Sequence, residues 1–188
     1  MGRWEPESRR RLEEAALALY GERGFENTTV AEIAERAGLT ERTFFRHFAD
    51  KREVLFWGAG ALQELFVSAV ASAPDSATPL EAVGGALAAA GALLQQRGDY
   101  PRQRQSIIVA SAELRERELI KLASLAAALA DALRARGVKD PAAGLTAEVA
   151  IAVFKTAFER WVADGNQLDL PGLMRESLDE LKILAAGG

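Results

Sequence analysis

The residues TERTFFRHFADK, at positions 40–51, combine three phenylalanines, the single histidine of the chain and several basic side chains. Such cations and hydroxyls can contact phosphate oxygens, and a guanidinium can also pair with the edge of guanine. A short helix buries one stripe, and Phe44 and Phe48 share a face because they lie four positions apart. Phe45 then lies on or near the exposed side, flanked by arginines. The segment therefore predicts a helix whose outer face can contact nucleic acid.

The sequence around this segment predicts two short helices joined by a tight turn. TVAE (29–32) matches a capping box, in which the Thr29 hydroxyl accepts from the Glu32 amide and the Glu32 carboxylate reaches back. This helix ends at Gly38, and only GLT separates it from the next helix, which Thr40 can cap. The spacing is that of a helix-turn-helix motif, whose second helix enters the major groove of DNA.

The second helix also carries the groups that reading a base pair requires. Thr43 supplies a small polar group at the entering end, and Arg42 can pair with guanine O6 and N7. Glu41 can accept from cytosine N4 or repel a wrong register. The Phe45 ring can contact a thymine methyl group, although a partly buried surface aromatic without that role is an equal alternative.

Helical periodicity continues along the whole chain, and no strand pattern stands out. The first helix is expected to open at Glu5-Pro6 and to stop at Gly24. We expect an all-α fold of about nine helices, in which residues 1–52 form a three-helix unit and residues 53–188 a helical bundle. The remaining helices are predicted over 50–73, 80–97, 101–111, 114–136, 143–164 and 171–185.

Composition narrows the class of protein further. The chain has 188 residues, a net charge of −4 and no cysteine, which excludes disulfides and thiolate metal sites and indicates a reducing compartment. Residues 38–52 nevertheless carry a local positive charge, which is compatible with DNA. The longest charge-free run, 82–96, is shorter than the roughly 20 residues that span a bilayer. No signal peptide is evident, so we expect a cytoplasmic protein without membrane association.

The segment TTVAEIAERAGLTERTFFRHFADKREVL (28–55) resembles the DNA-binding region of the TetR family of transcriptional regulators. The resemblance rests on a Thr-capped helix, a glycine turn, an aromatic pair, a histidine and a lysine at fixed spacing, and with ALALYGERGFENTT (16–29) it covers about the first 55 residues. It implies phosphate contacts from Thr29, Thr40, His47 and Lys51 and base contacts from Glu41, Arg42 and Phe45. Position 45 is very often tyrosine in this family, so Phe45 loses a hydroxyl that would bond a phosphate.

The segment FKTAFERWVADGNQLDLPGLMRESLDELKIL (154–184) is similar to the last two helices of the family, which usually form a four-helix dimer interface. The resemblance implies a homodimer on a palindromic operator, with recognition helices about one DNA turn apart. Trp161 and Leu178 are the expected interface residues. The RERE run (115–118) is interpreted as a solvated helix face.

Several aromatic and small residues bear on a ligand site. Trp57, Phe66 and Phe158 are candidates for lining an effector cavity, although ordinary core or dimer contacts explain each one as well. The small residues of GGALAAAGALL (84–94) either allow close helix approach or leave room for an apolar guest. The Arg160-Trp161 pair, together with the earlier helix ELRERELIKLASLAAALADAL (113–133), is similar to family members that respond to fatty-acyl ligands, which implies an apolar or acyl-type effector.

The expected function is that of a ligand-responsive, homodimeric DNA-binding repressor. The alternative is a helical adaptor or signalling protein that kept the fold without binding DNA. An enzyme is not expected, because one histidine, no cysteine and a Leu/Ala-rich body provide no catalytic cluster, and His47 has no companion with which to bind a metal. No cofactor is expected.

Overall fold

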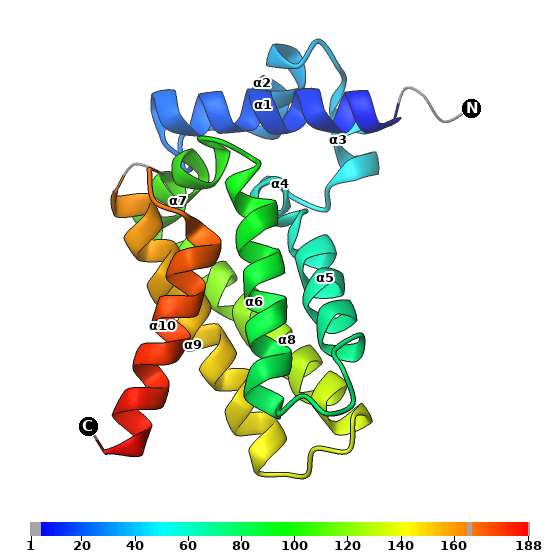
Figure 1. The fold of residues 1–188 in the computed structure, drawn as a ribbon. Helices are drawn as coiled ribbons and strands as arrows, with labels where there is room; N and C mark the ends of the chain where they lie inside the picture. The colour runs from blue at the N-terminus through cyan, green and yellow to red at the C-terminus, as the bar shows by residue number, and fades with distance from the viewer. Residues whose placement is uncertain (1–4, 165–166, 188) are drawn as a thin grey trace. The chain divides into compact units, whose positions relative to one another are not determined.

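The computed structural model describes residues 5–164 and 167–187. These ranges contain ten helices and no strand (Figure 1), which confirms the all-α prediction. The helices are α1 (Glu5–Arg23), α2 (Val30–Arg36), α3 (Glu41–His47), α4 (Glu53–Phe56), α5 (Ala59–Ala71), α6 (Pro79–Gln95), α7 (Tyr100–Ala110), α8 (Ala112–Ala135), α9 (Ala142–Ala163) and α10 (Leu170–Ala186).

The additional helix arises because the segment predicted as one helix over 50–73 is divided into α4 and α5. The division falls at Trp57 and Gly58. The Trp57 backbone keeps helical angles (φ −59°, ψ −32°), so the chain continues in nearly the same conformation. Glycine lowers helix propensity, which accounts for a break at this position.

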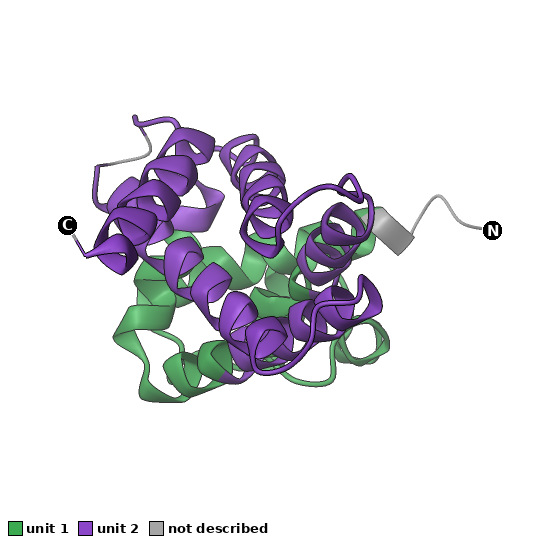
Figure 2. Cartoon of the chain, turned by 60° about the horizontal axis from the view of Figure 1, so that its bottom comes forward, with its two compact units in different colours: residues 1–59, 103–119 green, residues 60–102, 120–188 purple. Residues whose placement is uncertain are grey.

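The chain forms two compact units (Figure 2), and each is discontinuous in sequence. Unit 1 comprises the residues up to 59 together with residues 103–119, and unit 2 comprises residues 60–102 and 120–188. Residues 103–119, which include the end of α7 and the start of α8, therefore pack with the N-terminal helices. The predicted domain boundary after residue 52 stays a prediction.

The core of unit 1 brings α1 to α4 together with residues 103–119. Leu12 and Leu19 of α1 are buried in it. Ile107, Ile108 and Leu114 join the same apolar cluster from the other segment of the unit. The other buried members are Ala15, Ala16, Tyr20, Phe25, Ile33, Ala37, Phe44, Phe48, Val54, Leu55 and Phe56.

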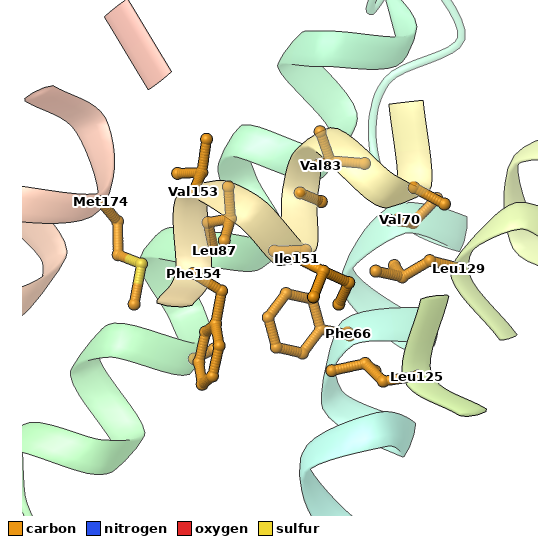
Figure 3. Close-up of a cluster of buried hydrophobic side chains, with 14 of the residues drawn as sticks. Phe66, Val70, Val83, Leu87, Leu125, Leu129, Ile151, Val153, Phe154 and Met174 are labelled. Carbon is orange, nitrogen blue, oxygen red and sulfur yellow. The ribbon is translucent and has the colours of Figure 1, made fainter. Parts of the chain in front are cut away.

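The core of unit 2 is built mainly by α6, α9 and α10, which pack against one another. Figure 3 shows part of its apolar cluster, in which the Phe66 and Phe154 rings lie side by side with their centroids 5.9 Å apart. Phe158 stacks on Phe154 with a centroid separation of 6.0 Å, and Trp161 follows at 6.0 Å. The aromatic residues of α9 therefore form a continuous row.

The small residues of α6 allow α10 to approach closely. A Cβ added at Gly91 would lie 3.0 Å from the backbone nitrogen of Pro171, and one at Gly84 would lie 3.0 Å from Cδ2 of Leu178. Backbone atoms cannot move aside as a flexible side chain can. Of the two interpretations of residues 84–94, close helix packing is therefore the one that these contacts confirm.

Residues Glu53–Ala71 are long and apolar enough to cross a membrane on length and composition alone. The segment contains α4 and α5, and it contributes Phe56 and Phe66 to the two apolar cores. The buried residues of the segment are Val54, Leu55, Phe56, Phe66 and Val70, so packing accounts for part of its apolar composition.

Candidate DNA-binding site

The first helix of the motif, α2, begins at the predicted capping box. The Thr29 hydroxyl accepts from the Glu32 amide at 3.3 Å, and the Glu32 carboxylate accepts from the Thr29 amide at 2.9 Å. The hydrogen bonds that the Thr29 amide and then its hydroxyl donate to the Glu32 carboxylate lower the pKa of Glu32, because they stabilise its negative charge. The local sequence alone therefore sets where α2 starts.

The turn of the motif depends on glycine at position 38. Gly38 has φ +63°, a left-handed conformation that side chains with a Cβ rarely adopt. A Cβ there would also lie 2.6 Å from Nη2 of Arg11 on α1. After the turn, the Thr40 hydroxyl accepts from the Thr43 amide at 3.2 Å and caps α3 as predicted.

The inner face of α3 anchors it, while its outer face is left open. Phe44 and Phe48 are 0% and 3% exposed, and their ring centroids lie 5.4 Å apart. Phe45 is 55% exposed. The ring of Phe45 contacts Phe44 edge-on with the centroids 5.5 Å apart, so one edge rests on the core and the rest faces outward. The interpretation of Phe45 as an outward-facing ring is the one that this exposure favours.

The arginines of α3 differ in their ion pairing from the arginines of α1 and α2. Glu41, Arg42 and Arg46 are exposed, and neither guanidinium pairs with a carboxylate of the described residues. On α1 and α2, in contrast, Arg23 pairs with Glu32 at 2.9 Å and Arg36 with Glu22 at 2.6 Å. The α3 arginines are thus free of internal ion pairs and available to an external anion.

The predicted phosphate-contact residues occupy different surroundings. Thr29 and Thr40 are exposed, but the Thr29 hydroxyl donates to Glu32 at 2.9 Å. His47 is half-buried, with its ring centroid 6.3 Å from that of Phe48. A phosphate would therefore have to compete with Glu32 for the Thr29 proton, whereas Thr40 is accessible.

Lys51 has internal hydrogen bonds that its place in the motif does not reveal. Its Nζ atom donates to the backbone oxygens of Phe25 and Thr28 at 2.9 Å each, and it lies 4.3 Å from the centroid of the Phe25 ring. These contacts attach the residue after α3 to the loop between α1 and α2. A phosphate contact by Lys51 stays a prediction, and the same ammonium group also stabilises the fold.

A buried tyrosine fixes the backbone at the same position. The Tyr20 hydroxyl donates to the backbone oxygen of Lys51 at 2.6 Å. Burial raises the pKa of this phenol, and the nearby charge of Asp50 raises it further. The phenol therefore stays protonated and keeps donating over the whole working pH range.

Residues far along the chain complete the unit, and sequence reasoning missed them. Arg117 donates through Nε to Glu53 at 2.7 Å, and Arg104 pairs with Glu118 at 3.1 Å. The RERE run (115–118) is therefore not simply a solvated face, because two of its members bind within the unit. No local pattern identifies such pairs, since their partners are distant in sequence.

The aromatic residues suggested for a ligand site fall in different parts of the chain. Trp57 belongs to unit 1, where the Arg9 guanidinium lies 5.3 Å from its ring centroid. Phe66 and Phe158 belong to unit 2 and to its aromatic core. Phe66 is fully buried, so a ligand would reach it only by displacing its neighbours.

The residues suggested for a dimer interface lie in the interior of the protomer. Trp161 is 1% exposed and donates through its indole nitrogen to the Leu168 oxygen at 3.1 Å, and Leu178 is 6% exposed. Both side chains complete the core of unit 2, so a partner docking on α9 and α10 would contact other residues. Exposed apolar residues on α10 are Ile183 and Leu184.

Comparison with known families divides the chain into two matching parts. Residues 12–56 match the family described as "Bacterial regulatory proteins, tetR family", and residues 77–185 match the "MftR C-terminal domain". The chain belongs to the TetR family of transcriptional regulators. The match over residues 12–56 confirms the resemblance drawn from residues 28–55.

Individual TetR-family proteins resemble the chain over different lengths. The HTH-type transcriptional regulator TcmR of Streptomyces glaucescens is 43% identical over 82 residues, which are 44% of this chain and 36% of TcmR. The chain thus matches about a third of the length of that relative.

Solved structures share the fold over nearly the whole chain. A protein of Syntrophomonas wolfei assigned to the same family has a TM-score of 0.70 at 18% identity, covering 97% of this chain and 96% of its own. FadR of Bacillus subtilis, solved with stearoyl-CoA, has a TM-score of 0.62 at 20% identity, covering 90% and 95%.

Proposed function

We propose that this TetR-family regulator is a homodimeric repressor that binds a palindromic operator and releases it when an apolar, acyl-type effector binds. In this proposal, residues 1–52 are the DNA-binding domain and residues 53–188 the ligand-binding and dimerisation domain. The protein acts in the cytoplasm and has no enzymatic role.

The observation that carries the DNA-binding part is the outer face of α3. The helix is anchored by two buried phenylalanines, yet it exposes Phe45 between two arginines that pair with no carboxylate in residues 5–164 and 167–187. Arg42, Glu41 and Phe45 are proposed to face the bases. Thr29, Thr40, His47 and Lys51 are proposed to contact phosphates.

Release of DNA follows from linkage between two conformations. An effector that binds better to a state with the wrong separation of recognition helices lowers operator affinity by at most its own differential affinity. Such couplings are typically about 1–3 kcal/mol. The acyl-type effector of this proposal is supported by FadR of Bacillus subtilis, which has this fold and was solved with stearoyl-CoA.

Selection of duplexes from a random pool tests the DNA-binding part. The expected outcome is a palindrome whose half-sites are about one helical turn, roughly 34–36 Å, apart. Enrichment of no sequence, together with no retention of DNA even at low salt, would favour the alternative of an adaptor that lost DNA binding.

Titration of the selected complex with stearoyl-CoA tests the effector class, with free coenzyme A as the matched control. Release by the acyl form alone supports an acyl-type ligand. Equal release by coenzyme A would instead indicate recognition of the nucleotide portion, and no release by either would exclude both.

A further inference from the structure

The DNA-binding unit is not one continuous segment, and the chain crosses its boundary three times. The crossings lie between residues 59 and 60, between 102 and 103, and between 119 and 120. The first falls in the first turn of α5, shortly after α4, and the other two fall inside α7 and α8. The backbone is continuous between the two units at these three points, so each is a covalent route by which a change in unit 2 can reach unit 1.

One side chain of unit 1 contacts the residues next to all three crossings. Arg104, just after the second crossing, donates through Nε to the Leu55 oxygen at 2.7 Å and lies 4.9 Å from the centroid of the Phe56 ring. Leu55 and Phe56 precede the first crossing. The other end of the guanidinium pairs with Glu118 at 3.1 Å, just before the third crossing.

The surroundings of Arg104 make these contacts stronger than those of an ordinary surface arginine. The Arg104 and Glu118 side chains are only 20% and 24% exposed, so solvent and salt screen the pair less. Gln105 also donates to the Glu118 carboxylate, at 3.3 Å. The Leu55 oxygen belongs to the last turn of α4, where helix carbonyls lack partners within the helix.

The start of α4 is attached to the same distant segment. Arg52 donates to Glu113 at 2.9 Å, and Arg117 donates to Glu53 at 2.7 Å. Both ends of α4 are therefore fixed to residues 103–119, and α4 follows α3 after a short loop. A displacement of residues 103–119 would carry α4 with it and change the position of the recognition helix.

We propose that Arg104 is a positioning residue that joins the three chain crossings and thereby couples unit 2 to the recognition helix. In this role Arg104 acts through its contacts with Leu55, Phe56 and Glu118. The inference rests on the proposed DNA-binding function, because Arg104 is inferred to carry the effect of DNA binding from the recognition helix to unit 2. Lysine cannot replace the arginine fully, since a single ammonium lacks the planar fork that serves two partners at once.

Hydrogen–deuterium exchange of the full chain, free and bound to its selected duplex, tests the proposal. In the wild type, DNA binding is expected to slow exchange within unit 2, because coupling between sites is reciprocal. Arg104→Ala should keep DNA affinity within about twofold. The factor by which DNA binding slows exchange in unit 2 should be at least about fivefold smaller than in the wild type, which is the lower end of typical coupling factors. Arg115→Ala is the matched control, because Arg115 is an exposed arginine that donates only to the Val109 oxygen of its own segment, at 2.7 Å.

The outcomes distinguish this inference from the proposed function. Wild-type slowing that persists in Arg104→Ala overturns it, and so does equal loss in the Arg115→Ala control. If Arg104→Ala does not fold, Arg104→Lys decides, with loss of slowing in support and full retention against. If the wild type binds no duplex, the proposed function fails. The inference is then tested by urea unfolding, in which the transition of unit 1 is compared with that of unit 2. The two units should then unfold together in the wild type and separately in Arg104→Lys, and joint unfolding of both variants overturns the inference.

Discussion

Phe45 shows how a single side chain can be exposed without being unsupported. More than half of its surface is open, while one edge packs against the buried Phe44 ring 5.5 Å away. The backbone of α3 is held by the buried ring, so Phe45 and its charged neighbours are presented on a fixed surface. An exposed aromatic between unpaired arginines suits contact with DNA better than contact with water.

Arg42→Ala should relax base preference, with a loss of about 1–3 kcal/mol if a bidentate contact to guanine disappears. The measurement is the affinity for the selected duplex and for duplexes changed at one position. Arg10→Ala is the control, because Arg10 is an exposed arginine already paired with Glu7 and Glu14. Unchanged discrimination in Arg42→Ala would remove that residue from base recognition.

Lys51→Ala should weaken binding to all sequences alike and reduce the slope of log affinity against log salt by about one. The variant should also lower the free energy of unfolding, because Lys51 Nζ bonds the Phe25 and Thr28 oxygens. Salt titration of the folded variant separates the two effects. A lower stability with an unchanged salt slope would assign Lys51 to the fold alone.

In unit 2, glycines of α6 determine how closely α10 packs against that helix. Where α6 meets the start of α10, Gly91 lies against backbone atoms of Pro171, and where it meets the middle of α10, Gly84 lies against Leu178. At other positions α6 has free space, and no atom would lie within 4 Å of a Cβ at Gly85. Glycines of one short stretch therefore have different roles, decided by what faces them.

Gly91→Ala should destabilise unit 2 by about 1–3 kcal/mol, the usual cost of forcing an extra group into a packed core. Gly85→Ala is the matched control on the same helix, and it should stabilise the protein by about 0.5–1 kcal/mol through better helix propensity. Urea unfolding of both variants provides the comparison. Equal effects would mean that α10 can move away from α6 at little cost.

The start of α4 should make unit 1 sensitive to acid. Asp50 accepts from the Arg52 and Glu53 amides at 2.8 and 3.1 Å, and its hydrogen bond from the Arg52 side chain is the main cause that lowers the pKa of its carboxyl group. Since the unfolded value is about 3.9, this stabilisation is present above about pH 5 and is lost as pH falls through the lower folded value.

Asp50→Asn should therefore lower the free energy of unfolding at neutral pH, by less than about 1 kcal/mol because the pair is partly exposed. The difference from wild type should shrink as pH falls below about 4, where the wild-type carboxyl group also becomes neutral. Urea unfolding at several pH values measures this trend. Asp131→Asn is the control on an exposed pair, and a pH-independent gap for Asp50→Asn would contradict the assigned cause.

At the scale of the molecule, α9 and α10 expose a surface that one protomer does not cover. Ile183 and Leu184 are 58% and 69% exposed, and they line a groove of about 690 Å³ formed by these two helices. The groove also includes Thr156 and Arg160 of α9. The proposed homodimer would bury this surface, while Trp161 and Leu178 support it from the interior.

Leu184→Glu should weaken dimerisation by about tenfold or more, as expected when a charge replaces an apolar residue at the centre of an interface. Operator affinity should fall with it, because two linked recognition helices bind more tightly than one. Sedimentation velocity over a range of protein concentrations gives the dimer constant. Val109→Glu is the control at an exposed apolar residue of unit 1, and a dimer that persists in Leu184→Glu would place the interface elsewhere.

Local sequence by itself determined the helices of the motif, their caps and the inward and outward faces of α3. These features depend on neighbours within about four residues: the Thr29–Glu32 box, the left-handed Gly38 and the four-residue spacing of Phe44 and Phe48. The same local rules located the family resemblance.

Only the tertiary structure decided the partners of side chains far apart in sequence. Lys51 meets the carbonyls of another loop, Trp161 is enclosed rather than presented, and Arg104 joins segments that lie some 50 residues from one another in the chain. The physical reason is that burial and ion pairing depend on which elements pack against each other. Helical periodicity predicts which face of a helix is apolar, but it does not predict which element packs on that face.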